Sequence, residues 1–132
     1  ADIQAMQVRI EKKFDEALPP ILLDRARVLQ AVINIIRNGA QAMLGGGVLK
    51  VSTNLSEDGK WAHIEVHDSG VGMSDNTLKH VFDPFFSTKL KGSGLGLAIT
   101  RRIVQDHNGD IDVFSEPDQG TRFIMSFPVR IE

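Results

Sequence analysis

The amino-acid sequence predicts an α/β fold, a two-layer α/β sandwich in which one mixed, mostly antiparallel sheet of about five strands carries three helices on one face. Five segments alternate between apolar and polar residues as strands do, and three show the period or capping residues of helices. The 132 residues contain no repeat, linker or low-complexity segment. Residues 1–132 are therefore expected to form a single domain.

The composition argues against several classes of protein. The chain has no cysteine, so disulfides and thiolate metal sites are excluded, which is compatible with a reducing compartment. Its net charge of −2 gives no electrostatic case for a nucleic-acid partner. No apolar run approaches the roughly 20 residues that span a bilayer, and there is no signal-peptide pattern. The first residue is Ala1, not methionine, which suggests a fragment of a longer protein.

A long helix is the first prominent element. An imperfect strand over residues 8–14 and a break at Pro19-Pro20 precede it. Asp24 is a candidate N-cap, and the helix is expected to end near Met43, before a run of glycines. Helical periodicity predicts an apolar stripe that faces the core, formed by Leu29, Val32, Ile36, Ala40 and Met43.

The opposite face of this helix carries a cluster of polar side chains: Arg27, Gln30, Asn34, Asn38 and Gln41. One interpretation is a solvated face. The other is functional, because asparagine is a poor helix former and two of them one turn apart suggest that their amide oxygens are needed. Such neutral oxygens suit Mg²⁺ that already carries phosphate oxygens.

Residues 48–55 and 61–67 form two strand patterns joined by a turn. Counting by two along the second strand places Asp68 on its apolar face. Asp68 is either a turn residue or an inward acceptor for a donor on a ligand. In the second case Gly70 and Gly72 would let that ligand approach the backbone.

The rest of the chain predicts a short helix over 74–81, a helix from near Gly94 to about 108, and strands over 110–115 and 121–129. One face of the last strand is expected to lie in the core and contains Thr121, Phe123, Met125 and Phe127. None of the four histidines forms a ligand pair on a helix, because His63 and His67 lie on the polar face of a predicted strand. We therefore expect structural or solvent-facing roles for His63, His67, His80 and His107.

The stretch FDPFFSTKLKGSGLGLAI, from Phe82 to Ile99, leads glycines straight into a helix. The free N–H groups and dipole of a helix N-terminus favour an anion such as phosphate. Taken alone, the glycines are equally compatible with a loose turn. The Rossmann and protein-kinase patterns fail because Leu97 replaces their third glycine, and the Walker pattern fails because no lysine follows the last glycine.

Five stretches occur in a characteristic order: NIIRNGAQAM, DSGVGM, FDPFFSTK, GSGLGLAI and QGTRFIMSFP. They resemble the N box, first glycine box, F box, second glycine box and terminal segment of the ATP-binding catalytic domain of bacterial two-component sensor histidine kinases. That family shares a superfamily with gyrase B, Hsp90 and MutL. The similarity spans about residues 8–130, is closest to the nitrogen-regulation and oxygen-sensor subgroup, and implies a Bergerat-type ATP-binding fold.

The resemblance implies ATP and Mg²⁺ as cofactors. Asp68 would accept the adenine amino group, with Gly72 and Thr121 helping through water. Asn38 would ligate Mg²⁺, and two further side chains would lie in reach of the phosphates, Asn34 and Gln41. Backbone N–H groups would hold the phosphates at Gly94, Leu95, Gly96 and Leu97.

The F box implies a lid over the triphosphate. Its base would be anchored by Phe82, Phe85 and Phe86, and its closing side chains would be Lys89, Lys91 and Ser93. Lys89 is expected to contact the γ-phosphate, which makes Asn38 and Lys89 the catalytic residues. Residues 87–93 are expected to be poorly ordered without nucleotide.

The implied activity is transfer of the ATP γ-phosphate to a histidine on a separate dimerisation domain, which then serves the receiver domain of a response regulator. The domain would be cytoplasmic and monomeric alone, in a homodimeric protein that is either membrane-anchored or soluble. A nucleotide-binding regulatory module without transfer remains an alternative, as does a clamp-type ATPase, although Asn34 stands where clamps carry a glutamate base. The F box argues against an anti-sigma-type serine kinase.

The sequence departs from the family pattern in three respects. Gly39 replaces the usual alanine, which is expected to cost the helix about 1 kcal/mol. Gln41 replaces a lysine that touches phosphate in many relatives. No H-E-x-x-x-P stretch surrounds any histidine, so the phosphoacceptor is expected to lie outside this chain.

Overall fold

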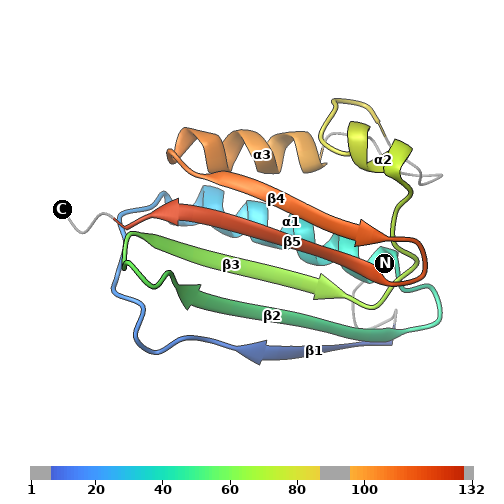
Figure 1. The fold of residues 1–132 in the computed structure, drawn as a ribbon, viewed down its shortest axis with the longest axis horizontal. Helices are drawn as coiled ribbons and strands as arrows, with labels where there is room; N and C mark the ends of the chain where they lie inside the picture. Colours follow the sequence, from blue (N-terminus) through green and yellow to red (C-terminus); the bar gives the residue numbers. More distant parts are fainter. Residues whose placement is uncertain (1–6, 87–95, 130–132) are drawn as a thin grey trace.

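Strands and helices follow one another in the order that the sequence predicts (Figure 1). The computed structural model describes residues 7–86 and 96–129. Within them the strands are β1 (Val8–Lys13), β2 (Gly47–Leu55), β3 (Trp61–Asp68), β4 (Asp110–Glu116) and β5 (Gly120–Pro128), and the helices are α1 (Arg25–Gln41), α2 (Asp75–His80) and α3 (Gly96–Asp106). The predicted N-cap is confirmed, since the Asp24 carboxylate accepts the backbone N–H of Arg27 at 3.2 Å.

The strands form one mixed sheet in the order β1-β2-β3-β5-β4. β1 is parallel to β2, and the other neighbouring pairs are antiparallel. α1 packs on β2 and β3 and α3 packs on β4 and β5, so both helices cover the same face, while the short α2 contacts β4 (Figure 1). The predicted two-layer α/β sandwich is therefore confirmed.

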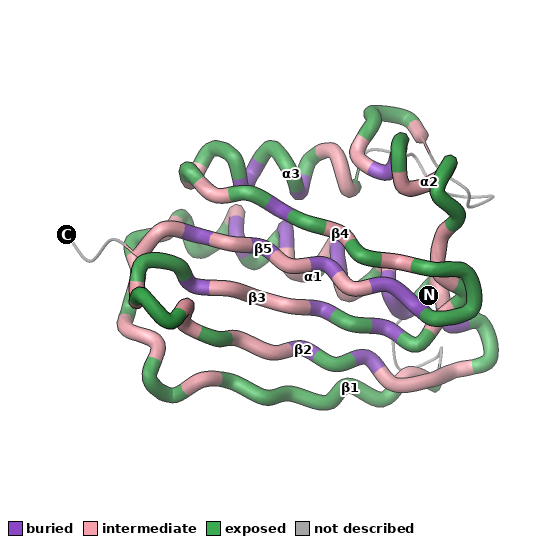
Figure 2. The backbone as a smooth tube through the Cα atoms, viewed as in Figure 1, coloured by how far each residue is buried: buried purple, intermediate pink, exposed green. Residues whose placement is uncertain are grey.

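The hydrophobic core lies between the sheet and the two longer helices. Phe123, Met125 and Phe127 of β5 are each no more than 1% exposed, as their alternation predicts. They pack with Ile35 of α1 and Leu49 of β2, which are also fully buried. Figure 2 shows these buried positions concentrated in the central strands, whereas β1 and the outer side of the helices are largely exposed. The middle of the sheet thus forms the centre of the hydrophobic core.

The predicted core stripe of α1 is partly wrong. Leu29 is 54% exposed, whereas Val28, Ala31 and Ile35 are buried. Periodicity gave weight to large side chains, but α1 packs against α3 as well as the sheet, and small residues let it approach both. The buried face is therefore rotated towards α3. The remaining predicted members, Val32, Ile36, Ala40 and Met43, do contact the core or are buried in it.

One end of the helical layer is held by polar contacts between α1 and α3. The Arg27 guanidinium contacts the Asp106 carboxylate at 2.8 Å, and Arg102 contacts the same carboxylate at 3.0 Å. The backbone N–H of Asp24 donates to Nε2 of His107 at 3.0 Å. These contacts fix the N-terminus of α1 against the C-terminus of α3.

We expect the Asp106→Asn variant to be less stable than the wild type at neutral pH, because it removes the carboxylate that both arginines contact. Hydrogen bonds from Arg27 and then Arg102 hold the Asp106 pKa below its ordinary value of 3.8. The carboxylate therefore stabilises the fold above pH 3.8, and this contribution is lost as the pH falls below 3.8 through the folded-state pKa. Urea unfolding at a series of pH values measures the difference between the two proteins.

Asp112→Asn is the matched control, because Asp112 is exposed on β4 and its replacement removes the same charge. The wild-type advantage over Asp106→Asn is expected to shrink below pH 3.8. An advantage that stays constant with pH, or one equal to that over Asp112→Asn, would contradict the assignment.

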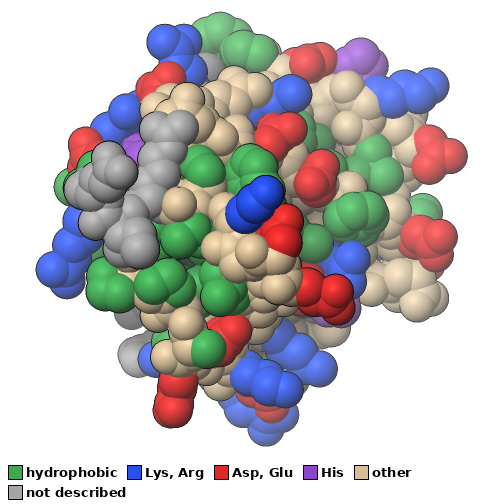
Figure 3. Space-filling view, turned by 60° about the vertical axis from the view of Figure 1, so that its left-hand side comes forward, with side chains coloured by type: hydrophobic (Ala, Val, Ile, Leu, Met, Phe, Trp, Pro, Cys, Tyr) green, Lys and Arg blue, Asp and Glu red, His purple; other side chains and the backbone are tan. Residues whose placement is uncertain are grey.

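The surface drawn in Figure 3 carries basic and acidic side chains interspersed, with hydrophobic side chains exposed between them. This mixture agrees with the small net charge of −2. Within the described residues no helix combines the length and apolar character that crossing a membrane requires.

Candidate functional site

A buried carboxylate marks the end of β3. Asp68 is only 3% exposed, on the apolar side of the strand as its sequence position predicts. Its Oδ1 atom accepts the backbone N–H of Gly70 at 2.8 Å and that of Thr121 at 3.2 Å. Its Oδ2 atom lies beside α1, 3.3 Å from the point where a Cβ on Gly39 would stand. Asp68 therefore both organises its own turn and lies at the boundary between β3 and α1.

The sheet register explains how Thr121 reaches Asp68. The two residues are partners in the antiparallel pair of β3 and β5, and Thr121 is 4% exposed. Gly120, at φ +85°, lies so close that a Cβ on it would overlap the carbonyl oxygen of Asp68. A side chain on residue 120 would therefore push the end of β3 away from the start of β5. The N–H of Thr121 would then move away from the carboxylate of Asp68.

The two glycines after Asp68, Gly70 and Gly72, lie very close to the backbone of other segments. A Cβ on Gly70 would overlap the carbonyl group of Ala42, at the end of α1. A Cβ on Gly72, at φ +69°, would overlap the carbonyl oxygen of Glu116. The predicted approach of a ligand to these glycines stays a prediction, and in the structure the protein's own backbone lies close to both.

Ser115 is a site residue that the sequence analysis missed. Its hydroxyl accepts the backbone N–H of Met73 at 2.8 Å and lies 2.9 Å from the carbonyl oxygen of Gly120 and 2.8 Å from Oγ1 of Thr121. It therefore ties the loop after Asp68 to the start of β5. Ser115 stands opposite Thr121 in the pairing of β4 and β5, and this register is what brings the two hydroxyls together.

The polar face of α1 is turned partly towards α3. Nδ2 of Asn34 lies 3.4 Å from Oγ1 of Thr100 and 3.5 Å from the carbonyl oxygen of Gly96. Asn38, one turn further along, is partly buried, and Gln41 at the end of the helix is exposed. Asn34 thus lies beside the first turn of α3, which contains two of the predicted phosphate contacts, Gly96 and Leu97.

The first turn of α3 presents little side chain at its start. Gly96 is exposed, and no atom of the described residues lies within 4 Å of the point where its Cβ would stand. Leu97 is partly buried and packs on the core, so its side chain anchors the turn. The other predicted phosphate contacts lie outside the described residues: Lys89, Lys91, Ser93, Gly94 and Leu95. The expected disorder of residues 87–93 also falls outside them.

The F box is anchored by two of its three phenylalanines. Phe82 packs edge-on to Phe123, with ring centroids 6.3 Å apart, beneath the guanidinium of Arg101. Phe86 packs against His80 at 5.6 Å. Phe85 is 76% exposed, with φ +67°, so the prediction that it anchors the lid is wrong. Its left-handed backbone conformation directs the chain so that this ring stands outside the core.

Three of the four histidines form hydrogen bonds with other residues of the domain. Nδ1 of His63 lies 2.8 Å from the hydroxyl of Ser126, and Nδ1 of His80 lies 2.8 Å from the carboxylate of Asp83. His107 joins α1 to α3, and His67 is exposed. In the part of the chain that the structure describes, no group of three or more His, Cys, Asp or Glu residues is placed to hold a metal ion.

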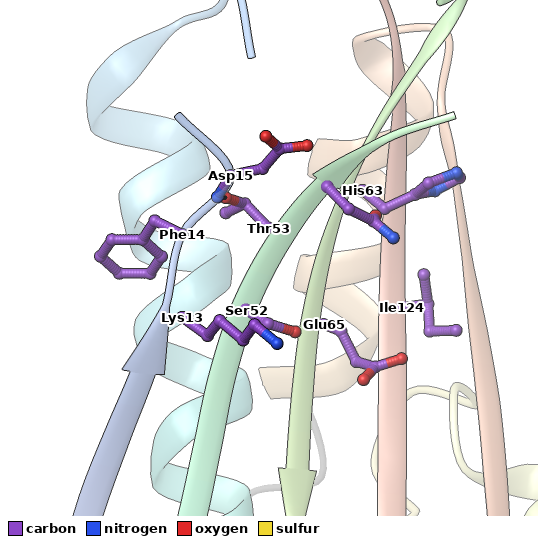
Figure 4. A pocket seen from close by; sticks show the side chains of 9 residues that line it. Lys13, Phe14, Asp15, Ser52, Thr53, His63, Glu65 and Ile124 are labelled. Carbon is purple, nitrogen blue, oxygen red and sulfur yellow. Dashed lines mark hydrogen bonds between the residues drawn. The ribbon is translucent and has the colours of Figure 1, made fainter. Parts of the chain in front are cut away.

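Among the described residues, two of the hollows lie away from Asn34, Asn38 and Asp68. One, of about 540 Å³, is on the sheet face opposite α1, and Figure 4 shows Lys13, Ser52 and Glu65 from neighbouring strands projecting side by side there. The other, of about 460 Å³, is lined by residues that include His67, Phe114 and Arg122. In both, the charged side chains are of mixed sign, and neither hollow is lined by the three predicted nucleotide contacts.

The chain is similar to known proteins over most of its length. A family model described as "Histidine kinase-, DNA gyrase B-, and HSP90-like ATPase" matches residues 23–131. The signal transduction histidine-protein kinase AtoS of Escherichia coli (strain K12) is 38% identical over 126 residues, which are 94% of this chain and 21% of AtoS. The chain therefore spans about a fifth of that relative.

Solved structures show the same arrangement. The catalytic domain of histidine kinase ThkA superposes with a TM-score of 0.82 at 30% identity, over 96% of this chain and 84% of that one. Full-length ShkA in complex with AMPPNP superposes with a TM-score of 0.86 at 27% identity, over 98% of this chain and 27% of that one.

Proposed function

The chain belongs to the family of histidine kinase-, DNA gyrase B- and HSP90-like ATPases, and on this premise we propose that it binds Mg·ATP and transfers the γ-phosphate to a histidine on another domain of the same protein. The AtoS relative, in which the matched region is 21% of the length, has ample further chain for such a domain. The observation that carries the proposal is the buried carboxylate of Asp68, held by backbone N–H groups from two segments.

Asp68 is the proposed adenine contact. A carboxylate that is 97% shielded from water is costly unless donors surround it, and the adenine amino group supplies one more donor. Oδ1 is oriented by Gly70 and Thr121, so the carboxylate is already positioned before nucleotide arrives. Gly72 and the hydroxyl of Thr121 lie at the same strand ends and are the proposed water-mediated contacts.

Asn38 is the proposed ligand of Mg²⁺. The donors present fit this ion, because Asn34 and Asn38 offer neutral amide oxygens on the helix face beside α3 and Gln41 follows one turn on. Neutral protein ligands leave most of the coordination of Mg²⁺ to phosphate oxygens and water. When bound, the ion would neutralise charge on the triphosphate. Asn38 would hold the phosphates in register with the first turn of α3, where Gly96 and Leu97 present backbone N–H groups.

Transfer requires positioning more than covalent chemistry from the protein. An imidazole nitrogen of the partner histidine attacks the γ-phosphorus, the bond to the β,γ-bridging oxygen breaks, and ADP leaves with that bond's electron pair. Lys89 is proposed to contact the γ-phosphate, with Lys91, Ser93, Gly94 and Leu95 as further contacts to the phosphates. The phosphohistidine would then donate to the receiver domain of a response regulator.

The proposal is tested by mixing this chain with the histidine-bearing domain of its own protein and γ-labelled ATP. We expect label on that domain that is stable in base and labile in acid, as phosphohistidine is. Nucleotide binding without label would instead identify a binding module. Rapid release of inorganic phosphate without label would identify an ATPase.

A further inference from the structure

A buried hydroxyl lies in the interface between α1 and α3. Thr100 of α3 is 0% exposed, and its Oγ1 donates to the carbonyl oxygen of Gly96, one turn earlier, at 2.9 Å. The same oxygen accepts the side-chain amide of Asn34, whose Nδ2 lies 3.4 Å away. Nδ2 also lies 3.5 Å from the carbonyl oxygen of Gly96. A small hydrogen-bond network therefore joins α1 to α3, and its members are Asn34, Gly96 and Thr100.

Packing alone does not require a hydroxyl at position 100. Threonine is a modest helix former, and its bond to the carbonyl one turn back does not strengthen a helix. Valine has nearly the same shape and would fill the buried space without a polar atom. What valine lacks is an acceptor for Asn34.

The contact fixes which way the Asn34 amide faces. Both acceptors, the Thr100 hydroxyl and the Gly96 carbonyl, lie on α3 and bind the nitrogen. The amide oxygen of Asn34 therefore points away from these two acceptors. With the hydroxyl removed, only the longer bond to Gly96 distinguishes the two orientations of the amide.

We propose that Thr100 is a positioning residue for phosphoryl transfer: its hydroxyl orients the Asn34 amide so that the amide oxygen serves the Mg²⁺ and phosphate side of the site. The inference rests on the proposed function, because Asn34 lies beside Asn38 and the first turn of α3. It goes beyond the family motifs, since Thr100 is fully buried between the helices and would act through Asn34. Asp68, on the other side of α1, is not part of this contact, so adenine recognition is expected to be independent of it.

The test compares Thr100→Val, which removes the hydroxyl, with Thr100→Ser, which keeps it, in the chain joined to its phosphoacceptor domain. Single-turnover phosphorylation is expected to slow by about three- to tenfold in Thr100→Val and to recover in Thr100→Ser. The Mg²⁺ concentration for the half-maximal rate is expected to rise in Thr100→Val only. Nucleotide affinity without Mg²⁺ is expected to stay within about twofold of wild type, since adenine contacts are intact. A wild-type rate in Thr100→Val, or equal slowing in both variants, would overturn the proposal.

A double-mutant cycle with Asn34→Ala tests the route through Asn34. Thr100→Val is expected to have no further effect in the Asn34→Ala background, and additive effects would count against the proposal. A readout independent of catalysis is the side-chain amide resonance of Asn34 in the nucleotide-free chain, which should shift in Thr100→Val but not in Thr100→Ser. An unshifted resonance would also overturn the proposal, even if the wild type proved to bind nucleotide without transferring phosphate.

Discussion

Replacing Asp68 with asparagine is expected to weaken ATP binding by about 10- to 100-fold while the domain stays folded. The asparagine oxygen can still accept the N–H groups of Gly70 and Thr121, so the turn and the strand pairing are retained. Its NH₂ group then stands where the second carboxylate oxygen was, and a donor faces the adenine amino group. Titration calorimetry measures the loss, and thermal unfolding verifies the fold.

The nucleotide itself supplies the control for this variant. Purine riboside triphosphate lacks the amino group, so the wild type is expected to prefer ATP to it and Asp68→Asn is expected to lose that preference. Asp112→Asn, which removes a charge from exposed β4, should bind ATP as the wild type does. Equal weakening of both nucleotides by Asp68→Asn would show that the carboxylate acts through the fold and does not recognise adenine.

Gly72→Ala is expected to reduce the free energy of unfolding by about 3–5 kcal/mol, a large part of the stability of a small domain. At φ +69° the alanine is strained, and its Cβ would overlap the carbonyl oxygen of Glu116. The turn between β4 and β5 must then move, although it is held by a 2.7 Å hydrogen bond from the N–H of Asp118 to the carbonyl of Val71. Urea unfolding monitored by circular dichroism measures the change.

The Gly59→Ala variant separates the cost of the positive φ from the cost of the overlap with Glu116. Gly59 has nearly the same backbone conformation, φ +73°, but nothing lies within 4 Å of the point where its Cβ would stand. This variant is expected to lose only the conformational cost of about 1 kcal/mol. If Gly59→Ala and Gly72→Ala lost equal stability, the close approach to Glu116 would have no energetic weight.

The sequence predicted the elements well because their signals are local. Alternation identified β2, β3 and β5, and counting by two placed Asp68 on the buried side before any partner was known. Helix starts were also predicted correctly: the carboxylate of Asp24, the predicted N-cap, accepts a backbone N–H group, and so does the hydroxyl of Ser74, the first residue of the helix predicted over 74–81.

The sequence was less informative where the environment of a residue depends on an element that is distant in the chain. Leu29 was assigned to the core because periodicity does not reveal that α1 leans on α3, where Ala31 allows the closer approach. The close approach of Gly70 to Ala42 and of Gly72 to Glu116 was missed because the sequence does not show which backbone passes them, and their predicted role towards a ligand stays a prediction. Ser115 was missed because its role depends on the pairing of β4 with β5. The roles of Asn38 and the lid lysines came from family resemblance and stay predictions.

The place of β5 in the sheet has a consequence for how the domain matures. β5 follows every other described helix and strand in the sequence, yet it lies between β3 and β4. During synthesis, β3 therefore waits with one edge unpaired until some 50 further residues have been made, and such non-local pairing folds slowly. The N–H of Thr121 arrives with that last strand, so the Asp68 carboxylate acquires its full set of backbone donors only when the sheet closes. A nascent chain should thus complete the proposed nucleotide site late and abruptly, when β5 pairs with β3.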